Sequence, residues 1–295
     1  MAALEVMPCL DSPERGETLR LVLDIDRGQA TRLGRSAVEA AESGRYVDPS
    51  GAVVDWQAAV QHACSLRRSL PPGFELPHPP MTGPVCTRVQ VSNETTLGAA
   101  LRLTNAGSRP LALNFANGKN PGGGFLSGSR AQEETLCRAS ALYQTLSGDP
   151  MYAAHARRPL PDSTTWSILS PRVPVFRDDA GQPLPAPWLL DVLTCAAPYA
   201  PALDHQEAAR LLAERILRVL SIARAFHYDT LVLGAWGCGA FGNDAGRTAR
   251  DFRQALTGTF AGVFREVVFA IVDWSPERRF LGPFREVFAA EQQAV

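Results

Sequence analysis

Short apolar segments alternate with helical patterns from residue 86 onward, and this alternation constrains the fold more than any other feature of the sequence. The strand candidates are CTRVQV (86–91), LALNF (111–115), WSILS (166–170), LLDVLTCA (189–196), TLVLGA (230–235) and EVVFAIVD (266–273). Helical patterns lie between them, at about 95–105, 133–146, 205–226 and 244–256. The strand candidates are short apolar runs, which are typical of strands covered on both faces of a sheet. Strands separated by helices therefore predict a three-layer α/β/α fold.

A proline-rich segment separates this region from the residues before it. Residues 71–84 read PPGFELPHPPMTGP, and a segment so rich in proline can continue neither a helix nor a central strand. Two helical patterns precede it, at about 28–46 and 54–69. We therefore expect residues 1–85 to form an N-terminal helical accessory region with a proline-rich linker, and residues 86–295 to form the main α/β domain.

Composition and charge narrow the class of protein. The net charge is −1, so a polyanionic ligand must be held by local groups, and no direct binding of nucleic acid is expected. The six cysteines are scattered, without a CxxC pair or a histidine at zinc spacing, which is typical of reduced thiols in a cytoplasmic protein. The N-terminal residues contain no apolar segment of the kind that a secretory signal has. The most apolar stretch is too short to span a bilayer, so we expect no membrane association.

The segment from 111 to 146 carries the most informative motif. A strand candidate ends at Phe115, an Asn- and Gly-rich loop follows, and a helix is predicted to open near Gln132. Glycine N–H groups can converge on an anion, since backbone without Cβ atoms approaches a ligand closely. The candidate binding residues of this motif are Asn117, Gly122, Gly123, Gly124 and Gln132. A flexible surface loop is the alternative interpretation.

Two carboxylates stand in the first turn of the helix that follows this loop. Acidic residues at that position are also favoured by the helix dipole, so Glu133 and Glu134 have a structural alternative as well. Adjacent residues of a helix point about 100° apart, given 3.6 residues per turn. The pair therefore cannot flank one glycosidic bond as the facing carboxylates of ordinary glycosidases do. We expect one of them to act as acid and base and the other to orient a sugar.

A second glycine-rich motif lies near the C-terminus, where TLVLGAWGCGAFGNDAG covers residues 230–246. A strand, a glycine loop and a helix N-terminus in this order are typical of sites that bind pyrophosphate. Residues 237–242 also match G-x-G-x-x-G, but the acidic residue of a dinucleotide fingerprint is not at its usual distance. A plain turn between a strand and a helix remains the alternative.

Three glycines, seven residues and then Gln132-Glu133-Glu134 resemble the signature of poly(ADP-ribose) glycohydrolases, and NFAN, NPGGGF and QEETLCRAS resemble their bacterial-type branch. The resemblance covers about 86–290 and implies a macrodomain-like fold with a mixed β-sheet. It implies that Glu134 is the catalytic acid and base and that Glu133 binds the ribose beside the bond that is cut. The second loop resembles the family's diphosphate-binding loop, GAWGCGxFGN, which implies substrate contacts at Gly237, Cys238, Gly239, Ala240, Phe241 and Gly242.

The same resemblance suggests further expectations. In macrodomain-like folds the end of the first strand lies near adenine, so Asn93, Glu94 and Thr95 are candidate base contacts. Helix capping is their structural alternative. The implied activity is mainly exo cleavage of ribose–ribose bonds in poly(ADP-ribose), including polymer on ADP-ribosylated proteins, with ADP-ribose as product. No metal or other cofactor is implied, and the family is associated with the DNA damage response.

Two functions of other classes stay open at this point. A macrodomain that only binds ADP-ribose would keep both glycine loops but would not need Gln132, Glu133 and Glu134. A nicotinamide-dependent oxidoreductase would use residues 237–242 and leave the first loop without a role. The block from Asn120 to Glu134 argues against the oxidoreductase.

Overall fold

A mixed sheet of eight strands forms the centre of the molecule. The computed structural model describes residues 4–78, 83 and 85–289. In spatial order the strands are β1 (Leu4–Val6), β5 (Thr87–Ser92), β10 (Glu266–Ala270), β9 (Thr230–Leu233), β6 (Pro110–Ala116), β8 (Pro183–Ala196), β7 (Ser167–Arg177) and β4 (Arg68–Leu70). The strands from β1 to β8 pair in parallel, whereas β7 and β4 are antiparallel to their neighbours. This confirms the expected mixed sheet.

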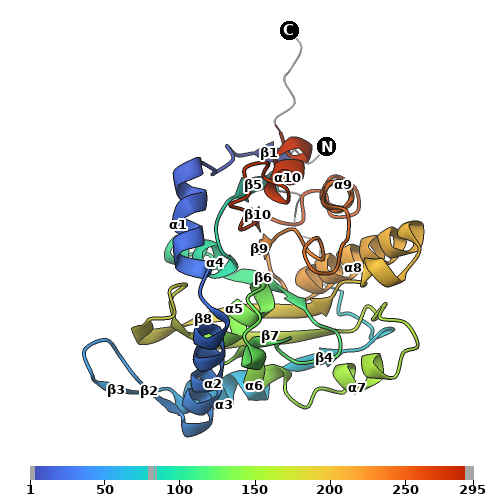
Figure 1. The fold of residues 1–295 in the computed structure, drawn as a ribbon. Helices are drawn as coiled ribbons and strands as arrows, with labels where there is room; N and C mark the ends of the chain where they lie inside the picture. The colour runs from blue at the N-terminus through green and yellow to red at the C-terminus, as the bar shows by residue number, and fades with distance from the viewer. Residues whose placement is uncertain (1–3, 79–82, 84, 290–295) are drawn as a thin grey trace.

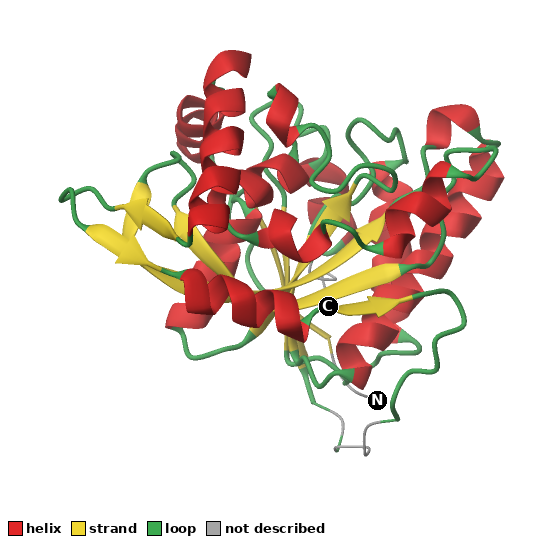
Figure 2. Cartoon of the chain, turned by 90° about the horizontal axis from the view of Figure 1, so that it is seen from below, coloured by secondary structure: helices red, strands yellow, loops and turns green. Residues whose placement is uncertain are grey.

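Helices cover both faces of the sheet, as Figures 1 and 2 show. One face carries α8 (His205–Ala225), α9 (Ala245–Thr257) and α10 (Leu281–Val287), whose apolar side chains form one core with the sheet. The other face carries α4 (Thr96–Asn105), α5 (Gln132–Ala139), α6 (Leu142–Leu146) and α7 (Pro150–Ala156) over a second core. Both cores contain buried strand residues, which explains why the strands are apolar throughout. The three-layer α/β/α prediction is confirmed.

The region before residue 86 contributes strands as well as helices. It contains α1 (Pro13–Leu23), α2 (Arg27–Ser43), α3 (Gln57–Leu66) and the hairpin of β2 (Arg45–Val47) and β3 (Val53–Asp55). Strands β1 and β4 of this region form the two edges of the central sheet. We expected only helices here, because three-residue strands leave too short a pattern to recognise. Residues 79–82 and 84 of the expected linker lie outside the described residues.

The predicted helix 133–146 is interrupted in the structure. Helix α5 ends at Ala139, and Ser140 adopts extended backbone that pairs with Val175 of β7. The Ser140 hydroxyl donates a hydrogen bond to the Leu136 carbonyl, so it satisfies one of the acceptors at the helix end. The interruption keeps α5 short, and hydrogen bonds from Gln132 hold its first turn at the end of β6.

The candidate strand 166–170 is the first part of a longer strand, β7, which continues to Arg177. The strand bulges where Arg172 adopts a φ of 55° and its N–H donates to Asp191. Strand β8 is likewise longer than expected and begins at Pro183. The resulting long hairpin carries residues 178–182 across to the N-terminal helices, where Leu33 of α2 contacts Gly181. Within the described part of the chain, no helix is long and apolar enough to cross a membrane.

Candidate active site

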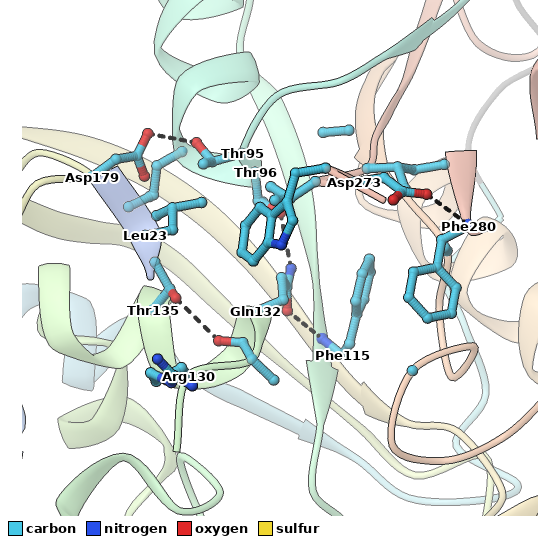
Figure 3. Close-up of a pocket in the computed structure, with 18 of the residues that line it drawn as sticks. Leu23, Thr95, Thr96, Phe115, Arg130, Gln132, Thr135, Asp179, Asp273 and Phe280 are labelled. Atoms are coloured by element: carbon cyan, nitrogen blue, oxygen red, sulfur yellow. Dashed lines mark hydrogen bonds between the residues drawn. The ribbon is translucent and has the colours of Figure 1, made fainter. Parts of the chain in front are cut away.

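A cleft lies at the carboxyl ends of the parallel strands, where open α/β sheets place their ligand sites. Two adjoining cavities of about 670 and 430 Å³ form it. We call the larger one the glutamate half, because Glu133 and Glu134 line it, and the other one the apolar half (Figure 3). Both halves share six residues: Phe115, Arg130, Ala131, Gln132, Ala235 and Gly239. The two predicted loops and the end of β6 therefore meet in one cleft.

The two glutamates lie in the first turn of α5 and are both buried, although they line the cleft. Glu133 accepts hydrogen bonds from the Asn117 N–H at 2.7 Å and from the Asn114 side-chain amide at 3.3 Å, so both of its oxygens are used. Glu134 accepts the Gly124 N–H at 3.0 Å through Oε1. Its Oε2 is buried and has no hydrogen-bond partner among the described residues. The second glutamate therefore keeps one carboxylate oxygen available for a ligand.

Gly123 shows why the loop carries consecutive glycines. It has a φ of +59°, and a Cβ atom there would stand 2.4 Å from Glu134 Oε1 and 2.9 Å from Glu133 Oε2. The backbone thus touches both carboxylates, and any side chain would displace them.

The amides of the triple glycine are already engaged within the protein. The Gly123 N–H donates to the Asn120 carbonyl, and that of Gly124 donates to Glu134. A hydrogen bond from the Gly122 backbone lowers the pKa of Glu133, which opposes the effect of burial there. The nest predicted from the sequence therefore holds the carboxylates of α5, and it offers few free donors to a phosphate.

Burial, with a smaller contribution from the adjacent charge of Glu134, raises the pKa of Glu133 to about 8. At neutral pH Glu133 therefore carries a proton. The site thus holds a proton on Glu133 beside an unpartnered oxygen of Glu134, and general acid–base chemistry needs a proton donor and a proton acceptor.

Gln132 fixes the start of α5 on β6. Its side-chain oxygen accepts the Phe115 N–H at 2.9 Å, and its amide donates to the Leu113 carbonyl at 2.8 Å and to Thr96 at 3.1 Å. It also lines both halves of the cleft (Figure 3). Gln132 therefore positions the helix whose next two residues are the glutamates.

The second loop offers the free donors that the first one lacks. It follows β9 and lines the opposite side of the glutamate half through Gly237, Gly239, Ala240 and Phe241. The backbone N–H groups of these four residues make no hydrogen bond to the described residues. The Asn243 side chain holds the loop by donating to the carbonyls of Pro198 and Gly237. A row of free amides beside a helix N-terminus is suited to an anion.

Cys238 and Gly242 occupy other places in this loop. The Cys238 thiol is buried and lies 3.6 Å from the Thr248 hydroxyl, away from the cleft. The Gly242 N–H donates to the Gly239 carbonyl, and its φ of +67° closes the turn. The Phe241 ring lines the cleft and packs edge-on against Tyr199, with 5.8 Å between ring centroids.

The apolar half accommodates a flat apolar group. Phe115, Trp274 and Phe280 line it together with Thr95, Thr96 and Asp179 (Figure 3). The Thr95 hydroxyl caps α4 by accepting the Gly98 N–H, and it donates to Asp179 at 2.6 Å. Burial raises the pKa of Asp179, whose Oδ1 has no partner among the described residues. Thr95 thus caps α4 and also lines the cleft, so the two roles predicted for it do not exclude each other.

Asn93 and Glu94 do not line either half of the cleft. The Asn93 amide donates to the Asp273 carbonyl and to Asp11, so it ties β5 to the loop after β10. Glu94 forms ion pairs with Arg102 and Arg15. The structure places both beside the apolar half, where they support its wall.

Sequence reasoning missed three residues of the site or its surroundings. His155 of α7 is buried, and its Nδ1 lies 3.1 Å from the Gly118 carbonyl while Nε2 lies 2.8 Å from Thr164. A carbonyl only accepts, so Nδ1 carries the proton and His155 holds the loop next to Asn117. Leu23 and Arg130 line the cleft where it meets the segment between α1 and α2. No spacing in the sequence links these residues to the glutamates, since only the tertiary fold brings them there.

Comparisons with known proteins agree with this geometry. A family model described as the catalytic domain of microbial-type poly(ADP-ribose) glycohydrolase matches residues 34–178, and this match begins within the region before the proline-rich segment. No curated protein matches the chain.

Solved structures give a longer match. A poly(ADP-ribose) glycohydrolase structure from Thermomonospora curvata is 42% identical with a TM-score of 0.83, covering 88% of this chain and 99% of that one. A second structure from this organism, bound to the inhibitor ADP-HPD, is 41% identical with a TM-score of 0.81, at coverages of 88% and 99%. The enzyme from Deinococcus radiodurans in complex with ADP-ribose is 39% identical with a TM-score of 0.70, covering 77% and 96%. The chain belongs to the microbial-type poly(ADP-ribose) glycohydrolase family, whose members are glycoside hydrolases.

Proposed function

We propose that this chain hydrolyses the ribose–ribose O-glycosidic bonds of poly(ADP-ribose), with Glu134 as general acid and base. The observation that carries the proposal is the unpartnered Oε2 of Glu134, buried at the cleft beside a carboxyl group that holds a proton at neutral pH. A macrodomain that only bound its ligand would have no need of this arrangement.

The shape of the cleft suggests how one ADP-ribose unit lies in it. The apolar half takes the adenosine, with Thr95 at its wall and Asn93 and Glu94 behind that wall. The free amides of Gly237, Gly239, Ala240 and Phe241 take the diphosphate. The distal ribose then reaches the glutamate half, where Glu133, fixed by Asn114 and Asn117, orients it.

The proposed reaction uses the Glu134 carboxyl group twice, first as an acid and then as a base. Protonated Glu134 donates to the 2′-oxygen of the leaving unit as the bond from that oxygen to C1″ breaks. The electron pair of the bond leaves with the oxygen, and the ribose becomes an oxocarbenium-like cation. The Glu134 carboxylate then takes a proton from a water molecule, whose oxygen bonds to C1″. The products are ADP-ribose and a polymer one unit shorter, and Glu134 is protonated again.

Several finer points rest on the family resemblance. We expect mainly exo cleavage of free polymer and of polymer on ADP-ribosylated proteins, without a metal or other cofactor. We place the activity in the cytoplasm and in the response to DNA damage. A direct contact with nucleic acid is not part of the proposal, and the net charge of −1 is in keeping with this.

The proposal is tested by following the sizes of the products released from poly(ADP-ribose) without added metal or nicotinamide cofactor. The matched variants are Gly123→Ala, whose methyl group would strike both carboxylates, and Gly282→Ala, whose methyl group would meet only ordinary contacts at 3.6 Å. We expect the wild type and Gly282→Ala to release ADP-ribose from the first time points, and Gly123→Ala to release it at least 100-fold more slowly, as for loss of a positioned acid (~10²–10⁴-fold). A wild type that binds ADP-ribose but releases none would be a binding module, and the proposal would be wrong.

A further inference from the structure

The junction between the two halves of the cleft contains a positive charge. Of the charged residues that line the cleft, Glu133 and Glu134 face the glutamate half, and Asp179, Asp273 and Arg279 face the apolar half. Arg130 lines both halves, and Figure 3 shows it at the apolar half. Any ligand that fills the two halves at once has to pass this side chain.

The N-terminal region holds Arg130 in place. Its Nη1 donates to Asp24 Oδ1 at 2.8 Å and to the Ile25 carbonyl, both in the connection between α1 and α2. Its Nε and Nη2 make no hydrogen bond to the described residues. The next residue of this segment, Asp26, caps α2, and Arg27 donates to the Ser127 carbonyl of the first loop. The segment between α1 and α2 is therefore held by the hydrogen bonds of Arg130 and Arg27. The guanidinium of Arg130 keeps Nε and Nη2 unbonded among the described residues.

A diphosphate in this cleft needs a cation on the side of the first loop. The amides of Gly123 and Gly124 are engaged within the protein, whereas across the cleft those of Gly237, Gly239, Ala240 and Phe241 make no hydrogen bond to the described residues. Two buried carboxyl groups line the same half, and any negative charge on them repels an anion. A fork of guanidinium nitrogens binds phosphate oxygens better than a neutral donor does.

We infer that Arg130 binds the diphosphate of the ADP-ribose unit, opposite the amides of residues 237–241, and that Asp24 and Ile25 position it. This inference rests on the proposed placement of the substrate. It makes the region before residue 86 a direct part of the binding site, since this region holds the guanidinium at the junction.

The experiment measures the affinities of ADP-ribose and of adenosine, which lacks the phosphates, for the full-length protein and its Arg130→Gln and Arg130→Lys variants. The control is Arg20→Gln, an exposed arginine on α1 whose ion-pair partner among the described residues is Glu17. We expect Arg130→Gln to weaken ADP-ribose about 10- to 100-fold and to reduce the dependence of its affinity on salt, because one charged hydrogen-bonded contact is lost. Adenosine affinity stays within twofold, and Arg130→Lys, which keeps the charge, recovers part of the loss.

Two results would overturn the inference. One is ADP-ribose affinity within twofold of the wild type in Arg130→Gln, and the other is an equal loss of adenosine affinity, which would show that Arg130 only supports the fold. Should Arg130→Gln fail to fold, the Lys variant decides. Lysine keeps the charge but lacks the guanidinium fork, so an ADP-ribose affinity equal to that of the wild type would contradict the inference. A wild type that neither binds ADP-ribose nor cuts the polymer would instead refute the proposed function.

Discussion

At the scale of residues, the site depends on one difference between two adjacent glutamates. Glu133 has both oxygens hydrogen-bonded by Asn114 and Asn117, whereas Glu134 has one oxygen bonded and one free. The difference follows from helix geometry, since consecutive side chains of α5 point in different directions and meet different parts of the loop. A fixed carboxyl group can orient a sugar, and a partly free one can exchange a proton.

The raised pKa of Glu133 predicts how stability depends on pH. The folded protein keeps this proton up to about pH 8, whereas the unfolded chain releases it near 4.5, so the wild type loses stability as pH rises between these values. Glu133→Gln has no such proton, and it can pair its amide with Asn114, whose Oδ1 has no partner among the described residues. The unfolding free energy of the variant relative to the wild type should rise by roughly 1 kcal/mol per pH unit.

Chemical denaturation at pH 5, 6.5 and 8 checks this expectation. Glu39→Gln, at an exposed position on α2, is the control and should show no such trend. A difference between Glu133→Gln and the wild type that stays flat from pH 5 to pH 8 would contradict the assigned burial effect.

The identities of the central residues could be predicted from the sequence, but their contacts could not. Gly122, Gly123 and Gly124 were expected to hold a phosphate, and the structure shows their amides engaged by Asn120 and the glutamates. A glycine nest accepts any nearby anion, and the sequence does not tell whether that anion is a ligand or a side chain of the next helix. Only tertiary packing decides this.

At the scale of elements, strands and helices with long apolar patterns were predictable and short ones were not. Helix α8, with its apolar stripe over 21 residues, agrees with the expected 205–226, whereas α1, α7 and the three-residue strands of the N-terminal region were not expected. Short elements gain their stability from packing rather than from intrinsic propensity, so their sequences carry little signal. The end of α5 at Ser140 could not be predicted either, because the helical pattern of the sequence continues to Leu146.

Helix α7 acts on the active site through His155. Burial lowers the pKa of this histidine to about 4, so it is neutral at physiological pH and its Nδ1–H donates to the Gly118 carbonyl. We expect His155→Ala to lower kcat about tenfold or more and stability by about 1–3 kcal/mol, because the carbonyl loses its donor and the loop that carries Asn117 loosens.

Steady-state kinetics with both variants, His155→Ala and the exposed-site control His62→Ala, separate this effect from a general one. The lowered pKa of His155 also predicts how its contribution to stability depends on pH. Folding favours the neutral imidazole, so the contribution is complete above pH 6.5 and is lost as pH falls toward 4. An unchanged kcat in His155→Ala would show that α7 does not support the active site through His155.

At the scale of the whole molecule, the region before residue 86 is built into the central sheet. Strand β1 pairs with β5 and β4 pairs with β7, so this region supplies both edges of the sheet. Arg177 of β7 also donates to the Leu33 carbonyl and to Ser36 of α2. The proline-rich segment marks a change of pattern along the chain, and the chain on either side of it still joins one sheet.

We therefore expect a fragment of residues 86–295 not to fold on its own. Loss of β1 and β4 leaves unpaired backbone groups along both edges, which favours aggregation. Calorimetry should show no cooperative transition for the fragment, in contrast to the full chain. A sharp transition at the temperature of the full chain would mean that residues 86–295 are an independent domain.

The central claim is that Glu134 transfers the proton, and a comparison of cleavage with binding in one variant tests it most directly. Glu134→Gln keeps an oxygen that can accept the Gly124 N–H, so the loop and the cleft should remain in place. The account predicts that single-turnover cleavage of poly(ADP-ribose) by this variant falls by ~10²–10⁴-fold, while its affinity for ADP-ribose stays within about threefold, a difference of under ~0.7 kcal/mol. Cleavage near the wild-type rate, or a loss of affinity as large as the loss of rate, would contradict it.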